Sequence, residues 1–185
     1  TRSKPTVTNE QQMQFNNGDH ILLRCEDGSV SYMLSGGQWA PTDNYYLRWV
    51  NEPVTYSAFY PVTEGTSVAN FSLPINQQSL ENLASADYMT CTVEDAINEG
   101  SGVLHLNMNR RMAKVIMTLD DIDSQSKALG VKIGSYQGYT DGNVSSGTAL
   151  VSPYDTIPEG WKAGQSGCKY TAIVAPGTAN PNSTF

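Results

Sequence analysis

The stretch VLHLNMNRRMAKVIMTL, residues 103–119, is the longest segment of this chain that can cross a core. In its first half the apolar residues Leu104, Leu106 and Met108 alternate with polar ones, which is the pattern of a half-buried strand. After the arginine pair the apolar positions change parity, to Ala113, Val115, Met117 and Leu119. Because a uniform strand cannot change faces, the stretch predicts two strand segments with a bulge, bend or break near residues 110–112.

A helix is the local alternative for this stretch. Met108, Met112, Val115 and Ile116 also fit helical spacing. The β-branched residues that follow, together with Thr118, favour strands.

On the N-terminal side, short apolar runs alternate with turn signals. Residues 21–25 and 30–34 are strand-like and are separated by a turn at residues 26–29. A second turn at residues 35–37 precedes Trp39, so we expect a β-meander. Further strands are expected at residues 45–50, 54–60 and 71–73, a strand or bridge at residues 87–93, and a short helical turn at residues 79–86.

On the C-terminal side, strands are expected at residues 129–133, 148–151 and 170–175. Residues 134–148 are rich in Gly, Ser and Tyr and predict a long loop or hairpin. The whole pattern predicts an all-β fold, an antiparallel β-sandwich with at most short helical turns.

Composition narrows the class of protein. The chain has 185 residues, of which 16% are charged, with ten Tyr and three Trp. A net charge of -7 disfavours nonspecific binding to nucleic acid or to an anionic membrane, so no nucleic-acid partner is expected. No apolar run reaches the length of a membrane helix. Thr1 is compatible with a removed signal peptide, a trimmed chain or a cytosolic origin.

The cysteines Cys25, Cys91 and Cys168 are far apart and odd in number. This makes a disulfide framework a poor prediction, although one pair could close. We expect three isolated, buried thiols that act as small hydrophobic side chains.

Catalytic and metal-binding motifs are missing from the sequence. The two histidines, His20 and His105, lie in no recognisable active-site or metal-ligand motif. Acidic residues at positions 120, 121 and 123 and the pair Asp141 and Asn143 could suggest calcium, but the EF-hand spacing fails and solvated turns are favoured. We therefore expect no enzyme activity, no metal and no cofactor.

Aromatic residues offer a different reading. Trp39, Trp49, Trp161 and the tyrosines could form a platform for sugar stacking, although such residues in β domains more often pack in the core. Asn70, Asn143 and Asn182 open formal glycosylation sequons, which matter only in a eukaryotic host.

The order of short motifs along the chain resembles a known family. These motifs are FNNGD (15–19), AFYP (58–61), QQ (77–78), SADYM (85–89), LNMNRRMAKV (106–115) and YTAIVAP (170–176). In this series the chain is similar to the fimbrillin-like family, cell-surface proteins of Bacteroidales that include type V pilus subunits. The similarity is carried mainly by residues 15–119.

The family motif maps onto residues expected to be structural rather than catalytic: Phe15, Gly18, Asp19, Trp39, Tyr60, Pro61, Gln77, Asp87, Met108, Arg110, Met112, Ala113 and Val115. One departure is visible, since Arg110 stands at a position where the family frequently has His.

The resemblance implies two β-sandwich domains, the first Greek-key and transthyretin-like. In this chain it implies a polar tail at residues 1–14, an N-terminal domain at residues 15–165 and the truncated start of a second domain at residues 166–185. It also implies export as a lipoprotein to the outer membrane, with the lipid anchor outside this chain.

The implied function is a noncatalytic structural or adhesive surface protein: a pilus subunit, tip component or anchor. The expected partners are other pilus subunits or further copies, joined by β-strand addition at an open groove, with host or glycan ligands also possible. In the family a protease removes an N-terminal segment to open the groove, and Arg2 is a conceivable cleavage point. The alternatives are a carbohydrate-binding module that uses Tyr and Trp of residues 134–161, and a hydrolase domain in which His20 or His105 meets a carboxylate and a Ser or Cys.

Overall fold

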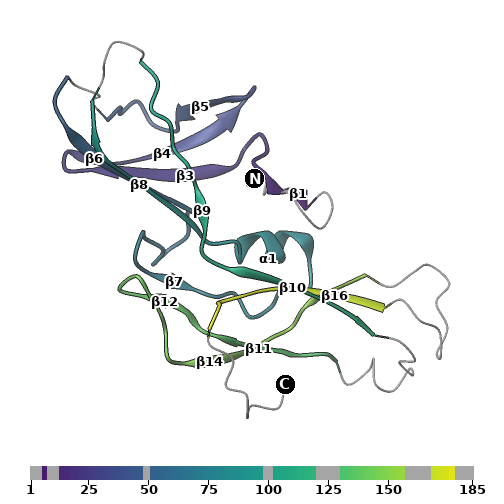
Figure 1. The fold of residues 1–185 in the computed structure, drawn as a ribbon. Helices are drawn as coiled ribbons and strands as arrows, with labels where there is room; N and C mark the ends of the chain where they lie inside the picture. Colours follow the sequence, from purple (N-terminus) through teal and green to yellow (C-terminus); the bar gives the residue numbers. More distant parts are fainter. Residues whose placement is uncertain are drawn as a thin grey trace. The chain divides into compact units, whose positions relative to one another are not determined.

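The computed structural model describes residues 6–7, 13–47, 51–97, 102–119, 130–156 and 168–177. The chain forms two compact units (Figure 1). Unit 1 comprises Thr1–Phe71 and Asp87–Arg111, and unit 2 comprises Ser72–Ala86 and Met112–Phe185. Each unit is therefore built from two separate segments of the chain.

Unit 1 is organised around one antiparallel sheet of six strands. Its order is β5-β4-β3-β6-β8-β9. The strands are β3 (His20–Cys25), β4 (Gly28–Ser35), β5 (Gln38–Pro41), β6 (Val54–Tyr60), β8 (Met89–Ala96) and β9 (Asn109–Arg110). A separate pair, β1 (Thr6–Val7) and β2 (Met13–Gln14), precedes them. The predicted meander is confirmed, because β3, β4 and β5 are consecutive antiparallel neighbours.

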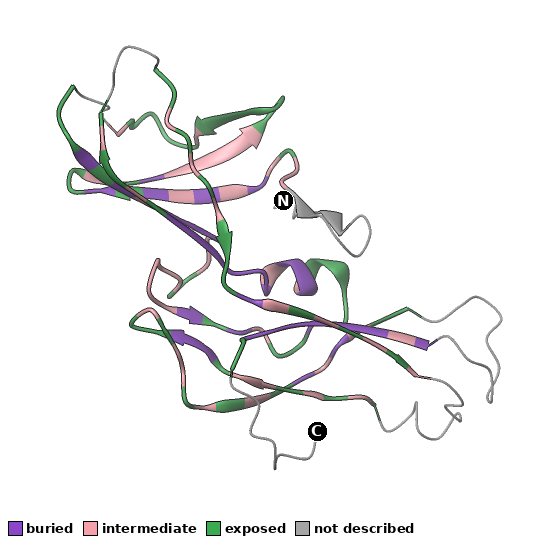
Figure 2. Cartoon of the chain, viewed as in Figure 1, coloured by how far each residue is buried: buried purple, intermediate pink, exposed green. Residues whose placement is uncertain are grey.

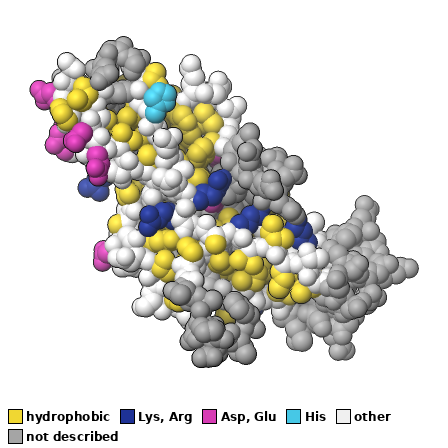
Figure 3. Space-filling view, viewed as in Figure 1, with side chains coloured by type: hydrophobic (Ala, Val, Ile, Leu, Met, Phe, Trp, Pro, Cys, Tyr) yellow, Lys and Arg dark blue, Asp and Glu magenta, His cyan; other side chains and the backbone are white. Residues whose placement is uncertain are grey.

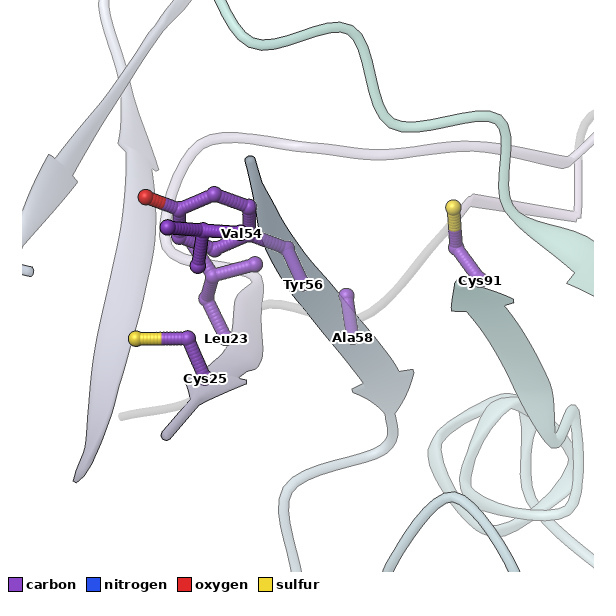
Figure 4. Packing of buried hydrophobic residues seen from close by; sticks show 6 residues of the cluster. All are labelled: Leu23, Cys25, Val54, Tyr56, Ala58 and Cys91. Atoms are coloured by element: carbon purple, nitrogen blue, oxygen red, sulfur yellow. The ribbon is translucent and has the colours of Figure 1, made fainter. Parts of the chain in front are cut away.

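The core of unit 1 lies on one face of this sheet. Leu23 on β3, Ala58 on β6 and Cys91 on β8 are partners in one row across three strands, and all three are buried. Tyr56 and Val54 extend the same cluster, as Figure 4 shows. Alternation along each strand puts the polar residues on the other face, and this is why the period-two pattern identifies the strands.

The cysteines are free and buried, as the sequence predicted. Cys25 on β3 and Cys91 on β8 flank β6, so two strand spacings of about 4.8 Å each separate their strands. That separation exceeds the reach of a disulfide, about 7 Å between Cα atoms. The two thiols therefore pack as small apolar groups in the same cluster (Figure 4).

Unit 2 is made of shorter sheets. One has the order β10-β16-β15, with β10 (Ala113–Leu119), β16 (Cys168–Val174) and β15 (Tyr154–Thr156). A second pairs β11 (Ile133–Tyr136) with β14 (Thr148–Val151). A third has the order β13-β12-β7, with β13 (Asn143–Val144), β12 (Gly138–Thr140) and β7 (Phe71–Ser72), where the chain passes from unit 1 to unit 2.

The short helix α1 (Leu80–Ser85) confirms the predicted helical turn. Ser79 is its N-cap, and the Ser79 hydroxyl accepts a hydrogen bond from the backbone N–H of Asn82 at 3.1 Å. One face is buried through Leu83 and Ala84, while Leu80 is half exposed. The helix thus turns one apolar face inward and leaves the other in solvent.

The stretch that predicted the fold does change parity where expected. β9 ends at Arg110 and β10 begins at Ala113, so the predicted break is confirmed, and it coincides with the passage from unit 1 to unit 2. Burial alternates along β10 (Figure 2). Residues 103–108 alternate in burial as predicted but form no strand, because no ladder of backbone hydrogen bonds is assigned to them.

Two other predicted strands are wrong in part. Residues 45–47 form no strand, and residues 48–50 lie outside the described part of the chain. Residues 130–132 also precede any strand, since β11 begins only at Ile133. Both errors come from short apolar runs whose local pattern does not reveal whether a neighbouring strand is available for pairing.

The predicted fold class, an all-β antiparallel β-sandwich with only short helical structure, is confirmed. The predicted domain boundaries stay a proposal. β16, which the sequence placed at the start of a further domain, pairs along its whole length with β10 within unit 2.

Candidate functional site

The candidate site is an apolar groove on unit 1, with a volume of about 660 Å³. Figure 3 shows hydrophobic side chains gathered over the sheet of this unit. The groove is lined by Phe15, Ile21, Leu23, Tyr32, Gln38, Trp39, Leu47, Tyr56, Gly102, Val103, Leu104, Leu106 and Met108. This surface is the buried face of the sheet at a place where the fold covers it only in part.

The sheet forms the floor of the groove and an extended segment forms one wall. Ile21 and Leu23 on β3, Tyr32 on β4 and Tyr56 on β6 supply the floor. Residues 102–108, named here the cover segment, supply the wall. The half-buried Leu104, Leu106 and Met108 of this segment pack against the buried cluster of the sheet. The cover segment takes the place of a second sheet without being paired as one.

Aromatic rings close one end of the groove. The Phe15 ring packs edge-to-face on Trp39, with ring centroids 5.3 Å apart, and on Tyr60 at 5.5 Å. Tyr60 is buried, whereas Trp39 keeps 36% of its surface exposed. These contacts hold Phe15 as a fixed part of the lining.

The groove carries no charge on its described lining residues. Burial raises the pKa of the Tyr32 phenol, an effect that a hydrogen bond with the Leu47 backbone partly offsets. Burial also raises the pKa of Tyr56, so both phenols stay neutral at physiological pH. Such a surface suits an uncharged, apolar occupant and offers no acid or base for catalysis.

The turn before β3 fixes the position of Phe15. In this turn the backbone N–H of Asn16 donates to Asp19 Oδ2 at 2.6 Å, and the backbone N–H of Asp19 donates to the Asn16 carbonyl at 2.9 Å. Gly18 allows this turn with a φ of 91°. The Asp19 side chain is almost fully buried, and its Oδ1 atom has no hydrogen-bond partner among the described residues. Burial raises the Asp19 pKa to about 6 against the opposing effect of the Asn16 N–H.

Other family-motif residues of unit 1 lie away from the groove. Arg110 Nε is 3.2 Å from Oδ2 of Asp87, a buried carboxylate next to β8. Pro61 follows β6 through a cis peptide bond. Met108, by contrast, belongs to the groove lining. The role of these residues as a family motif stays a prediction. In the structure they take part in packing and in an ion pair.

The remaining motif residues belong to unit 2. Gln77 is completely buried, and its amide donates to the Ile173 carbonyl at 2.8 Å while accepting from the Ile173 N–H at 2.8 Å. Met112 is buried, and Ala113 and Val115 lie on the half-buried face of β10. These residues connect strands of unit 2 rather than forming a ligand site.

The hydrolase alternative gains little from the structure. His20 Nδ1 lies 3.4 Å from Ser31 Oγ on the neighbouring strand, a long contact outside the groove lining. His105 is exposed. Asp141 and Gly142 form the turn between β12 and β13, with φ values of 48° and 77°. Among the described residues no group of three His, Cys, Asp or Glu side chains could hold a metal ion.

The described tyrosines of residues 134–161 do not form an exposed platform for sugar stacking, whereas Tyr45 and Tyr46 of unit 1 are exposed. Tyr139 is buried, and Tyr136 and Tyr154 are half-buried. Trp49 and Trp161, and the acidic residues at 120, 121 and 123, lie outside the described part of the chain, as do Arg2 and Asn182.

Several groove residues carried no signal in the sequence beyond being apolar. Tyr32, Leu47 and Tyr56 come from three separate segments, and only the fold brings them together. The period-two pattern at Leu104 and Leu106 predicted that these side chains face a core, but not that a groove lies beside them.

Comparison of this chain with a solved structure and with models of protein families shows which family it belongs to. The crystal structure of a "putative cell adhesion protein" from Bacteroides uniformis has a similar fold, with a TM-score of 0.59 and 14% sequence identity over 91% of this chain and 72% of that one. The model of the fimbrillin-like family matches residues 7–185. The chain belongs to the fimbrillin-like family, as the motif series predicted. No curated protein matches it significantly.

Family membership supports a fimbrial or adhesive role at the cell surface and points away from enzyme activity. In the part of the chain that the structure describes, no helix has the length and apolar character needed to span a membrane.

Proposed function

We propose that this chain is a noncatalytic subunit of a surface fimbria that assembles by β-strand addition at the groove of unit 1. The observation that carries the proposal is the cover segment. It lies extended over the apolar face with strand-like alternation, yet no strand is assigned to residues 102–108. Its extended backbone borders the groove, where an incoming strand would lie beside it.

The shape and chemistry of the groove fit such a strand. Alternate side chains of an incoming strand would enter the groove, where they meet Tyr32, Tyr56 and the half-exposed Trp39. The opposite side chains would face solvent. Because the lining is uncharged, the entering side chains should be apolar. The expected donor is another pilus subunit or a further copy of this chain.

Val103→Glu tests the proposal in the native host. Val103 lines the groove and is 53% exposed, so this change places a carboxylate in the groove while removing little core packing. A strand that covers the groove would have to bury this charge, which is strongly unfavourable. We expect surface assemblies that contain the protein to fall roughly tenfold, as measured by blotting of detergent-resistant ladders from the cell envelope.

Ile97→Glu is the matched control. Ile97 is also an exposed apolar residue of unit 1, at 40% exposure, but it is not part of the groove lining. This variant should assemble like the unmodified protein. If Val103→Glu assembles as well as Ile97→Glu, the groove is not the site of strand addition.

We also propose that the mature protein is an outer-membrane lipoprotein acting as a shaft subunit, tip component or anchor. Intact-mass measurement of the protein from its native envelope should show a lipid modification. Immunogold labelling of fimbriae then separates the three roles, by signal along the shaft, at the tip or at the base. An unlipidated product in the cytosol would contradict this localisation.

A further inference from the structure

Unit 2 has a long sheet edge that lacks the usual protection. β10 has seven residues and pairs in one continuous register with β16, from Ala113 opposite Val174 to Leu119 opposite Cys168. Among the described residues β10 pairs with β16 alone, and its other edge has no strand partner in that part of the chain. It contains no proline and no register shift, and Lys114 is its one charged residue.

Three other sheet edges carry features that discourage pairing. β5 is short and ends in Pro41. β15 has three residues, includes Asp155 and follows Pro153. β8 beyond its pairing with β9 carries Glu94 and Asp95, and Asp95 has a positive φ of 49°. Proline, charge and irregular backbone all discourage edge pairing. β10 carries only Lys114, and with seven residues it is longer than the uncharged edges β11 and β14, which have four each.

The sequence of β10 is complementary to itself. In an antiparallel pair of two copies centred on Ile116, Lys114 of one copy faces Thr118 of the other, so no like charges meet. Val115 faces Met117 on the half-buried side of the sheet, where Met117 already packs against Cys168 and Tyr170. Ile116, 38% exposed, faces Ile116 of the second copy. Cross-strand pairs of this kind stabilise a sheet.

We propose that β10 is a second association surface, distinct from the groove, and that its occupant is β10 of a second copy of this chain. The two three-stranded sheets would join into one six-stranded sheet through an isologous, two-fold contact. Figure 3 shows hydrophobic side chains gathered over this region of unit 2 with basic side chains beside them.

Self-association is measured by analytical ultracentrifugation of the full chain over a wide concentration range. We expect a reversible dimer. Ile116→Lys puts two lysines face to face at the centre of the contact and should weaken dimerisation roughly tenfold. Leu150→Lys adds the same charge on β14, where Leu150 is 66% exposed, and should leave the dimer unchanged.

Two further variants keep the test independent of any folding defect. Thr118→Glu would face Lys114 of the second copy in both halves of the contact and should tighten the dimer about fivefold. Ile116→Cys should form an intermolecular disulfide under mild oxidation, because directly opposed residues in antiparallel strands have Cα atoms about 4.5–5.5 Å apart. Leu150→Cys is the control for random crosslinking.

A chain that stays monomeric at every concentration overturns the proposal. So does a dimer that survives Ile116→Lys, or an Ile116→Cys variant that crosslinks no faster than Leu150→Cys. None of these results bears on the groove, so the proposed function is tested separately.

Discussion

Each unit buries a polar side chain beside its core, but the two side chains are satisfied very differently. Gln77 in unit 2 makes hydrogen bonds with both backbone groups of Ile173 and also donates to the Pro74 carbonyl at 3.0 Å. Asp19 in unit 1 has a carboxylate oxygen with no hydrogen-bond partner in the described residues. Gln77 does not titrate, so its contribution to unit 2 does not change with pH, whereas the contribution of Asp19 to unit 1 should.

The two units also differ in the kind of surface that they leave open. Unit 1 protects its edges and leaves part of an apolar sheet face accessible. Unit 2 has an unprotected edge at β10. The groove presents mainly apolar side chains and the β10 edge presents mainly backbone groups, so the two units are suited to different contacts.

The largest effect should come from Gln77→Leu. The substitution leaves the N–H and carbonyl groups of Ile173 buried without partners, which should destabilise unit 2 by about 3–4 kcal/mol. Hydrogen exchange of the β16 amides measures this, because exchange resolves the stability of each unit separately. Gln78→Leu changes an exposed neighbour and serves as the control. Equal exchange in the two variants would show that the Gln77 bonds contribute little.

Asp19 should make the stability of unit 1 depend on pH. Its pKa is raised from 3.8 to about 6 in the folded state, so folding favours the protonated form. This contribution is fully present below pH 3.8 and is lost as the pH rises through about 6, at a cost of roughly 2–3 kcal/mol.

Asp19→Asn removes that titration. The free energy of unfolding can be measured by hydrogen exchange of the β3 amides. It should rise in the variant relative to the unmodified chain as the pH rises from 4 to 6. Asp43→Asn, at an exposed carboxyl, should show no such gain. A difference that does not vary with pH would exclude Asp19 as the titrating group.

Tyr88 offers a smaller test within unit 1. Its hydroxyl oxygen lies 2.9 Å from the Ser67 carbonyl and 2.8 Å from the Val68 carbonyl, so its single O–H proton is shared between these two acceptors. Its ring stacks on Phe71 with the centroids 4.7 Å apart. Tyr88→Phe keeps the stacking and removes the O–H donor, which should cost about 1–2 kcal/mol. Denaturant unfolding compared with Tyr46→Phe, an exposed position, measures the loss. Equal denaturant midpoints for Tyr88→Phe and Tyr46→Phe would contradict this expected loss of stability.

The smallest effect is expected at the cap of α1. Ser79→Ala removes the acceptor for the Asn82 N–H and should destabilise unit 2 by about 1 kcal/mol. Ser79→Asp provides an equivalent acceptor and should restore the stability. If Ser79→Asp is as unstable as Ser79→Ala, the cap is not the cause.

Local patterns explain what could be predicted. The parity change around Arg110, the hairpin turns of the meander and the helical turn at residues 79–86 are all set by residues close in sequence, and each was predicted. The family was also predicted, from the order of short motifs. These features need no knowledge of distant parts of the chain.

Long-range pairing explains what could not be predicted. Residues 103–108 have the alternation of a strand, but whether they pair depends on a neighbour supplied by the fold. The groove requires Leu47 and Tyr56 to meet the cover segment, and Gln77 requires a partner 96 residues away. The residues themselves carry no local signal for either encounter.

The pairing of Gln77 with Ile173 also determines when unit 2 can complete its fold during synthesis. Ribosomes release the amino end first, and about 5–20 residues emerge each second, so the interval between these two residues lasts roughly 5–20 s. Unit 1 has all its segments once Arg111 has emerged, while the Ser72–Ala86 segment of unit 2 still awaits β16. During this interval Leu73 and Leu83 lack their final surroundings. With this order of assembly, unit 2 stays incomplete until late in synthesis, after all segments of unit 1 have emerged.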